Sequence, residues 1–153
     1  MRREFQKCQK HWLPDLFLKK LCSFLAICQL RLDFDSFTTS ITNADGTCLD
    51  TLAIATGSSK TIPGICGQNT GQHIYLETGR STSAQTLTFT VAATGSITFK
   101  IKIQQIECSS VAKAPNDCFQ YFTGVSGRVQ TFNFPGQIVP VNLQYSTCIR
   151  DYS

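Results

Sequence analysis

Residues 97–108 read ITFKIKIQQIEC, and the alternation of their side chains decides the fold class. Between positions 97 and 103 every second residue is large and apolar, and the residues in between are threonine or lysine. Successive side chains of a β-strand point to opposite faces of a sheet, so this period of two predicts a strand with one buried and one hydrated face. The residues expected to face a core are Ile97, Phe99, Ile101 and Ile103.

Other stretches repeat this alternation on both sides of residues 97–108. In CQLRLDFDSF, residues 28–37, apolar residues alternate with charged ones, and in residues 86–91 apolar residues alternate with threonine. Val129–Phe134 and Leu143–Arg150 also read as strands. Turn-rich segments lie at 43–46, 56–59 and 93–96. Short strands joined by close turns are typical of an antiparallel sandwich, so we predict an all-β, jelly-roll-like antiparallel β-sandwich.

The chain contains eight dispersed cysteines in 153 residues. Zinc sites bring paired ligands two to four residues apart, whereas the nearest cysteines here are Cys22 and Cys28, and the histidines are His11 and His73. Structural disulfides explain the cysteines better than a metal site does. The sequence therefore predicts a disulfide-stabilised protein from an oxidising compartment, which is extracellular or secreted.

Residues 1–27 are expected to be an atypical basic and apolar leader, irregular or helical. They hold six basic and two acidic residues, which accounts for the net charge of +4. The leader is a poor signal peptide, because its short apolar run starts only after Lys20 and Phe24 stands where cleavage needs a small residue. Its helical apolar spacing favours, as an alternative, a helix on a membrane surface. No apolar stretch approaches the roughly 18–20 residues of a transmembrane helix.

Residues 28–153 balance eight basic against eight acidic residues, so we expect no nucleic-acid partner. We also predict that the protein is not an enzyme. His73 is the only histidine beyond the leader and reads as a structural or surface residue, with no paired nucleophile evident. Asp33 and Asp35 alternate with apolar residues, so we expect them to face water rather than to form a pair of catalytic carboxylates.

Arg31, Lys100 and Lys102 offer a second candidate for a site. Together they could form a basic stripe for an acidic glycan. Hydrated strand faces explain the same residues without a ligand.

Several segments together resemble a known family. In chain order they are CQLRLDFDSF (28–37), CLDTLAI (48–54), PGICG (63–67), GQNTGQHIYLE (67–77), IKIQQIEC (101–108), CFQYFTGVSGRVQTFNFP (118–135) and QYSTCIR (144–150). They resemble the CUB domains, particularly arthropod secreted proteins with two such modules in tandem, here apparently truncated at both ends. The resemblance implies an extracellular CUB-like β-sandwich whose loops bind a protein or glycan.

The resemblance also implies a division of the chain. Residues 28–108 form a CUB-like module without its usual opening strands, 109–117 form a linker, and 118–153 form the opening segment of a second CUB-like module. We expect the aromatic residues of 118–153 to dock onto the first module and supply the strands that it lacks, in which case Arg128 would be protected from proteolysis.

Three disulfides follow from the resemblance and from the strand arrangement that it implies. Cys48 pairs with Cys66, and Cys118 pairs with Cys148 as in a CUB opening. Cys28 and Cys108 meet if residues 28–37 run antiparallel beside residues 97–108. Cys8 and Cys22 are left over, and their partners stay open.

The resemblance raises calcium as a possible ligand, because many CUB modules bind it with a glutamate and two aspartates. Asp50 matches one aspartate. The glutamate position falls near Ser40, and the other aspartate position falls in 91–94, which has no acid. We therefore expect no cofactor, although Asp45 could substitute from the adjacent turn.

The function that this sequence predicts is a non-catalytic extracellular binding or scaffold module. The alternative is a regulatory fragment of a secreted serine protease or of another multidomain extracellular protein, since resembling modules flank such protease domains. A third interpretation is a membrane-surface protein that acts through residues 1–27. The sequence does not identify the partner.

Overall fold

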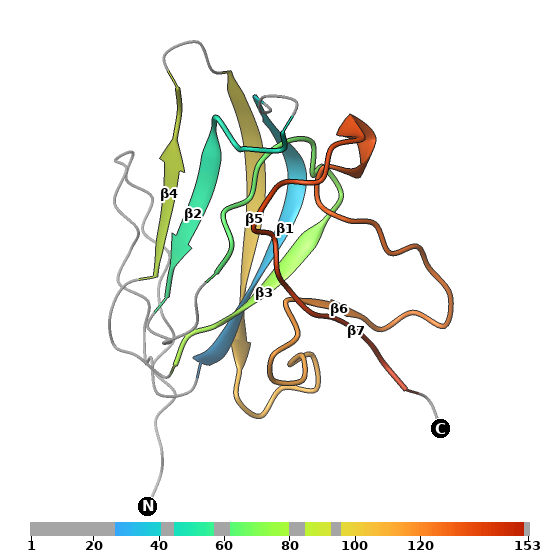
Figure 1. Cartoon of the computed structure of the whole chain (residues 1–153). Coiled ribbons are helices and arrows are strands. Elements are labelled where there is room, and N and C mark those ends of the chain that lie inside the picture. Colours follow the sequence, from blue (N-terminus) through green and yellow to red (C-terminus); the bar gives the residue numbers. More distant parts are fainter. Residues whose placement is uncertain (1–26, 41–44, 57–61, 80–84, 93–95, 152–153) are drawn as a thin grey trace, which may run out of the picture.

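The computed structural model describes residues 27–40, 45–56, 62–79, 85–92 and 96–151. These residues form an all-β structure with three disulfides (Figure 1). Its elements are β1 (Ile27–Thr39), β2 (Thr51–Ala55), β3 (His73–Glu77), β4 (Thr86–Thr90), β5 (Ile97–Glu107), β6 (Gln120–Phe122), the 3-10 helix η1 (Phe134–Gly136) and β7 (Thr147–Ile149). Residues 1–26 of the leader, most of the predicted turns, Cys8 and Cys22 lie outside the described residues, and Ile27 is the first residue of β1. No described helix is long and apolar enough to cross a membrane.

Two antiparallel sheets form the sandwich. One has the strand order β3-β1-β5, and the other pairs β2 with β4. The inward residues of both sheets meet in one core, where Leu32, Leu52 and Ile74 are fully buried. This arrangement confirms the predicted all-β sandwich class.

Strand β1 lies in the centre of the larger sheet and shows why the alternation predicts burial. Leu32 and Phe34 are buried in the core, whereas the side chains between them point to the other face. The register with β5 shifts between Phe34 and Ser36, so Asp35 is an extra residue in β1. Such a bulge shifts the alternation of side chains along the strand by one residue. Phe37 therefore also points inward, and its ring stacks on Phe34 with centroids 4.8 Å apart.

Strand β5 forms as predicted, but its inward face is only partly buried. Phe99 is 48% exposed and Ile103 is 44% exposed, so the expectation that both are core residues is wrong. The reason is their place in the sheet. β5 pairs with β1 on one side and is the last strand in the described sheet on the other, and the facing sheet has just two described strands.

The three disulfides join the pairs of cysteines that the resemblance implies. The Cα atoms are 4.8 Å apart in Cys28–Cys108, 5.8 Å in Cys48–Cys66 and 5.6 Å in Cys118–Cys148. The first bond ties the start of β1 to the end of β5, which lie side by side because the two strands are antiparallel.

Residues 109–151, here called the C-terminal segment, pack on the β3 side of the sandwich, away from β4 (Figure 1). Phe132 is fully buried in the main core and contacts Phe119 and Tyr145 edge-on. The Tyr75 N–H donates a 2.7 Å hydrogen bond to the Phe119 carbonyl, so the backbone of the segment lies against the outer edge of β3. As expected, the aromatic residues of the segment dock onto the sandwich.

The strands within the C-terminal segment differ from the expected ones. Val129–Phe134 is not a strand, because Asn133 adopts a left-handed conformation (φ 60°) and η1 follows directly. Residues 143–150 contribute only β7. This short strand pairs with β6 in parallel, in a sheet that is otherwise separate from the two antiparallel ones.

Candidate functional site

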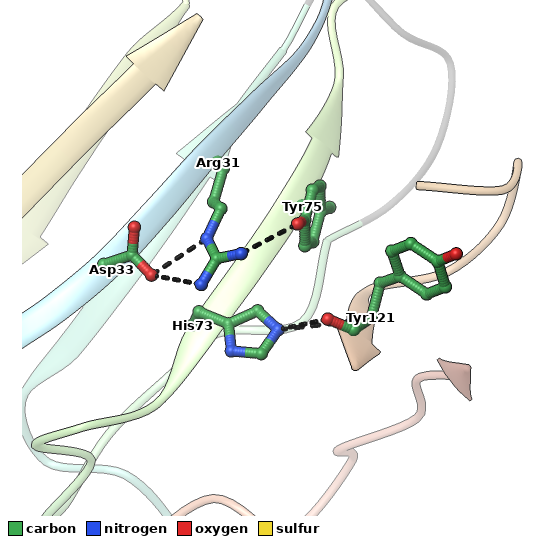
Figure 2. A network of polar contacts seen from close by, with 5 residues as sticks. All are labelled: Arg31, Asp33, His73, Tyr75 and Tyr121. Atoms are coloured by element: carbon green, nitrogen blue, oxygen red, sulfur yellow. Dashed lines mark hydrogen bonds and ion pairs between the residues drawn. The ribbon is translucent and has the colours of Figure 1, made fainter. Parts of the chain in front are cut away.

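A cluster of polar side chains lies on the outer face of the β3-β1-β5 sheet, opposite the core. The alternation that buries Leu32 turns Arg31 and Asp33 to this face. Arg31 donates from Nε and Nη2 to Asp33 Oδ1, at 2.9 and 2.7 Å, and from Nη1 to the Tyr75 hydroxyl at 2.9 Å (Figure 2). The guanidinium carbon also lies 5.4 Å from the centre of the Tyr75 ring. The cluster therefore holds Arg31 in one orientation across two strands.

Beside this cluster the outer face is hollowed. The hollow has a volume of about 470 Å³ and is lined by Arg31, Asp33, Phe34, Asp35, Thr70, Gly71, Gln72, Lys102 and Gln104. Most of these side chains are polar, and the charged ones include both acidic and basic residues. Such a lining suits a polar ligand held by hydrogen bonds, for example a sugar or a protein loop.

His73 does not line this hollow. Its Nε2 lies 2.9 Å from the Tyr121 carbonyl and, in the tautomer protonated at Nε2, donates a hydrogen bond to it (Figure 2). The ring also contacts Tyr75 and Phe122 edge-on. Burial lowers the pKa of His73 below its usual 6.5, and the positive charge of Arg31 lowers it further. His73 thus joins β3 to the C-terminal segment.

Asp33 and Asp35 each contact a different basic residue rather than one another. Asp33 binds Arg31, whereas Asp35 is exposed and forms a loose ion pair with Lys100, in which Nζ lies 3.5 Å from Oδ2. Lys102 has no ion pair within the described ranges. The outer face is therefore mixed in charge and does not form the basic stripe that the three cations suggest in the sequence.

Asp50 lies at one end of the sandwich, between β2 and the neighbouring loops. It is buried, and its two carboxylate oxygens accept hydrogen bonds from the Ala92 N–H at 2.7 Å and the Ser40 N–H at 3.0 Å. The Ala92 bond is the main reason that the pKa of Asp50 lies below its usual value, although burial opposes this effect. Asp45 is exposed and accepts a hydrogen bond from the Thr47 N–H. Among the described residues no three metal-binding side chains gather.

Sequence reasoning missed the buried amides that fasten the C-terminal segment. The Gln29 side chain donates to the Ala114 carbonyl at 3.0 Å and accepts from the Ala114 N–H at 2.9 Å. Asn133 accepts from the Gln68 N–H at 3.0 Å. Alternation places Gln29 on the outer face of β1, but it cannot reveal which later residue covers that position.

The comparisons with known proteins bear on this same segment. Residues 115–153 match the family model of the animal CUB domain. The match supports a CUB domain and agrees with the disulfide-linked antiparallel sandwich. CUB domains are generally non-catalytic and typical of extracellular proteins. No curated protein and no solved structure matches the chain.

Proposed function

We propose that the protein is a non-catalytic extracellular module that binds a protein or glycan partner. The observation that carries this proposal is the CUB match of residues 115–153 in a chain whose described part is held by three disulfides. Disulfides persist mainly in oxidising compartments, which supports secretion. We retain the proposed division into a CUB-like module at 28–108 and the opening of a second one at 118–153.

The polar hollow on the outer face is the proposed contact surface, together with the neighbouring sandwich loops. Arg31 is pre-oriented there by Asp33 and Tyr75, so it loses little side-chain freedom when it binds. Arg, Gln and carboxylate side chains on a rigid sheet can make several hydrogen bonds to one polar ligand.

An array of extracellular glycans and matrix proteins tests this proposal with the oxidised, secreted chain. We expect binding that falls at least about tenfold in the double variant Arg31→Gln and Asp35→Asn, because charged hydrogen bonds contribute about 1.5–3 kcal/mol each. Glu107→Gln, an exposed change at the far end of β5, is the matched control and should bind normally. Equal binding by both variants, or no binding partner on the array, would contradict the proposal.

We further propose that calcium plays no part in folding or binding. Both oxygens of Asp50 already accept backbone hydrogen bonds, and one retained carboxylate gives little charge for a divalent ion. Millimolar calcium should therefore leave the Tm unchanged. A ligand at 100 times its Kd stabilises a fold by about 2.7 kcal/mol, so a rise of several degrees in a thermal melt would show that a site exists.

A further inference from the structure

The two lateral edges of the sandwich are closed to different degrees. At the β3 edge the C-terminal segment covers the sandwich. The Tyr75 N–H donates a hydrogen bond to the Phe119 carbonyl there, and Phe132 of the segment is buried in the core. At the opposite edge, β4 and β5 are the last strands of their sheets within the described ranges (Figure 1).

An apolar hollow lies between the sheets at this second edge, and we call it the edge groove. It has a volume of about 550 Å³, and its apolar walls are Leu30, Leu32, Ile54, Leu76, Leu87 and Ile103. The stacked rings of Phe89 and Phe99, with centroids 4.0 Å apart, bridge the two sheets farther along the same strands. Protein interiors are packed as densely as organic crystals, so a hollow of this size in a sandwich is suited to receive further apolar side chains.

The backbone of β5 forms one rim of the edge groove. β5 spans 11 residues and, among the described strands, pairs with β1 alone. The outward N–H and C=O groups of such an edge strand form a template for another strand. Ile103 lines the groove and Ile101 packs against the core beside it, whereas Lys100 and Lys102 point to the outer face. An added strand would therefore place alternate side chains in the groove and the others beside the two lysines.

The positive charges of Lys100 and Lys102 indicate which kind of strand can pair with β5. Lys102 has no ion pair with a described residue, and Lys100 makes only the loose contact with Asp35, with 77% of the lysine side chain exposed. Opposite charges on neighbouring strands attract, and like charges repel. Two copies of β5 paired antiparallel along their full length would centre on Lys102 and place the Lys102 side chains of the two copies opposite each other. The partner therefore differs from β5 itself.

We propose that the edge groove binds an extended segment of another protein, which adds as a strand to β5. Apolar residues at every second position enter the groove, and acidic residues lie beside Lys100 and Lys102. This inference rests on the proposed function as a binding module and gives it a second surface, which adjoins the polar hollow at Lys102, with a partner of defined chemistry. Strand addition of this kind takes its affinity from main-chain hydrogen bonds and its specificity from alternate side chains.

Synthetic 11-residue peptides test the proposal on the full oxidised chain. The probe alternates valine with glutamate, and three control peptides carry lysine in place of glutamate, the same residues in scrambled order, or N-methyl groups on the bonding amides. We expect the probe alone to bind in a calorimetric titration and to slow hydrogen exchange at the amides of β5. The variant Lys102→Glu should weaken the probe roughly fivefold and strengthen the lysine peptide. Arg128→Glu, an exposed charge reversal in the C-terminal segment, should change neither.

Three results would overturn this inference. One is equal binding of the scrambled or N-methylated peptide. Another is occupation of the groove by a fatty acid without protection of β5, which would indicate a small-molecule site. The third is protection of β5 by concentration-dependent dimerisation without peptide. None of these results depends on Arg31 or Asp35, whose variants test binding at the polar hollow, so failure here and failure of the proposed function can be told apart.

Discussion

At the scale of single residues, Asn133 links the C-terminal segment to the rest of the sandwich. Its N–H donates to Asn69 Oδ1 and its Nδ2 donates to the Ile138 carbonyl, both at 2.7 Å. Gly67 lies directly against it, with a φ of +84°. A Cβ atom at position 67 would overlap the Asn133 side chain. The close approach of the two segments thus depends on a glycine.

Gly67→Ala should destabilise the fold by more than the cost of its backbone conformation. A left-handed alanine costs about 1–2 kcal/mol, and the displaced Asn133 adds the loss of its hydrogen bonds. Gly71→Ala is the matched control, because Gly71 has a φ of +83° but nothing within 4 Å of its Cβ position. Urea denaturation compares the two variants. Equal losses of stability would show that Asn133 does not limit position 67.

His73 should make stability depend on pH. Its pKa is lowered in the folded state, mainly by burial, so below about pH 6.5 the unfolded chain binds a proton more readily than the folded chain does. The contribution to stability is therefore complete above pH 6.5 and is lost as the pH falls through the lower pKa of the folded state. Urea unfolding at pH 7.5 and pH 5.0 measures this loss. His73→Gln, which cannot titrate, should reduce it, and an unchanged pH dependence would contradict the assignment to His73.

At the scale of elements, the alternation predicts burial best for a strand that has partner strands on both sides. Strand β1 is central, and its alternation correctly predicts its buried residues. The same alternation predicts β5 but overestimates its burial, because a period of two does not reveal whether a strand lies at an edge.

At Val129–Phe134 the composition predicts a strand that does not form. Contacts with Asn69 and Ile138 hold Asn133 in a turn instead.

The candidate site was predictable only in part from the sequence. Arg31 and Asp33 follow from alternation, whereas their partner Tyr75 and the fastening amides depend on contacts between distant segments.

The disulfides should differ in their contribution to stability according to the loop that each one closes. Cys28–Cys108 spans 80 residues and Cys48–Cys66 spans 18. In the chain-entropy model these loops correspond to about 4.5 and 3 kcal/mol. Replacing both cysteines of each pair with alanine should therefore destabilise the fold by about 1 kcal/mol more for the longer loop, as measured by chemical denaturation. The reverse order would indicate that strain or residual structure in the unfolded chain outweighs loop entropy.

At the scale of the whole molecule, the C-terminal segment and the residues before Cys108 share one core. Phe132 is buried in the same cluster as Leu52 and Ile74. Arg128, in contrast, lies in an exposed stretch, so protection from proteolysis at this residue is a poor measure of docking. Substitution within the shared core is a better one.

Phe132→Ala should destabilise the entire sandwich by about 3–5 kcal/mol, because it leaves a cavity in the shared core. The expected result is a single unfolding transition at a lower denaturant concentration, measured by fluorescence and circular dichroism. Phe134→Ala removes a ring that is mostly exposed and should cost less than about 0.5 kcal/mol. Two separate transitions in the unmodified chain, with Phe132→Ala affecting one of them, would show that the parts fold independently.

The Cys28–Cys108 bond also determines how the sandwich responds to mechanical tension. Cys28 lies at the start of β1 and Cys108 directly follows β5. Their Cα atoms are 4.8 Å apart, and a disulfide joins their side chains. Tension that reaches the backbone at Cys28 and Cys108 is transmitted through the sulfur bridge, and the strands between these two residues carry little of it. In an extracellular chain under stretch, the sandwich between them would keep its length until a reductant opened that bond.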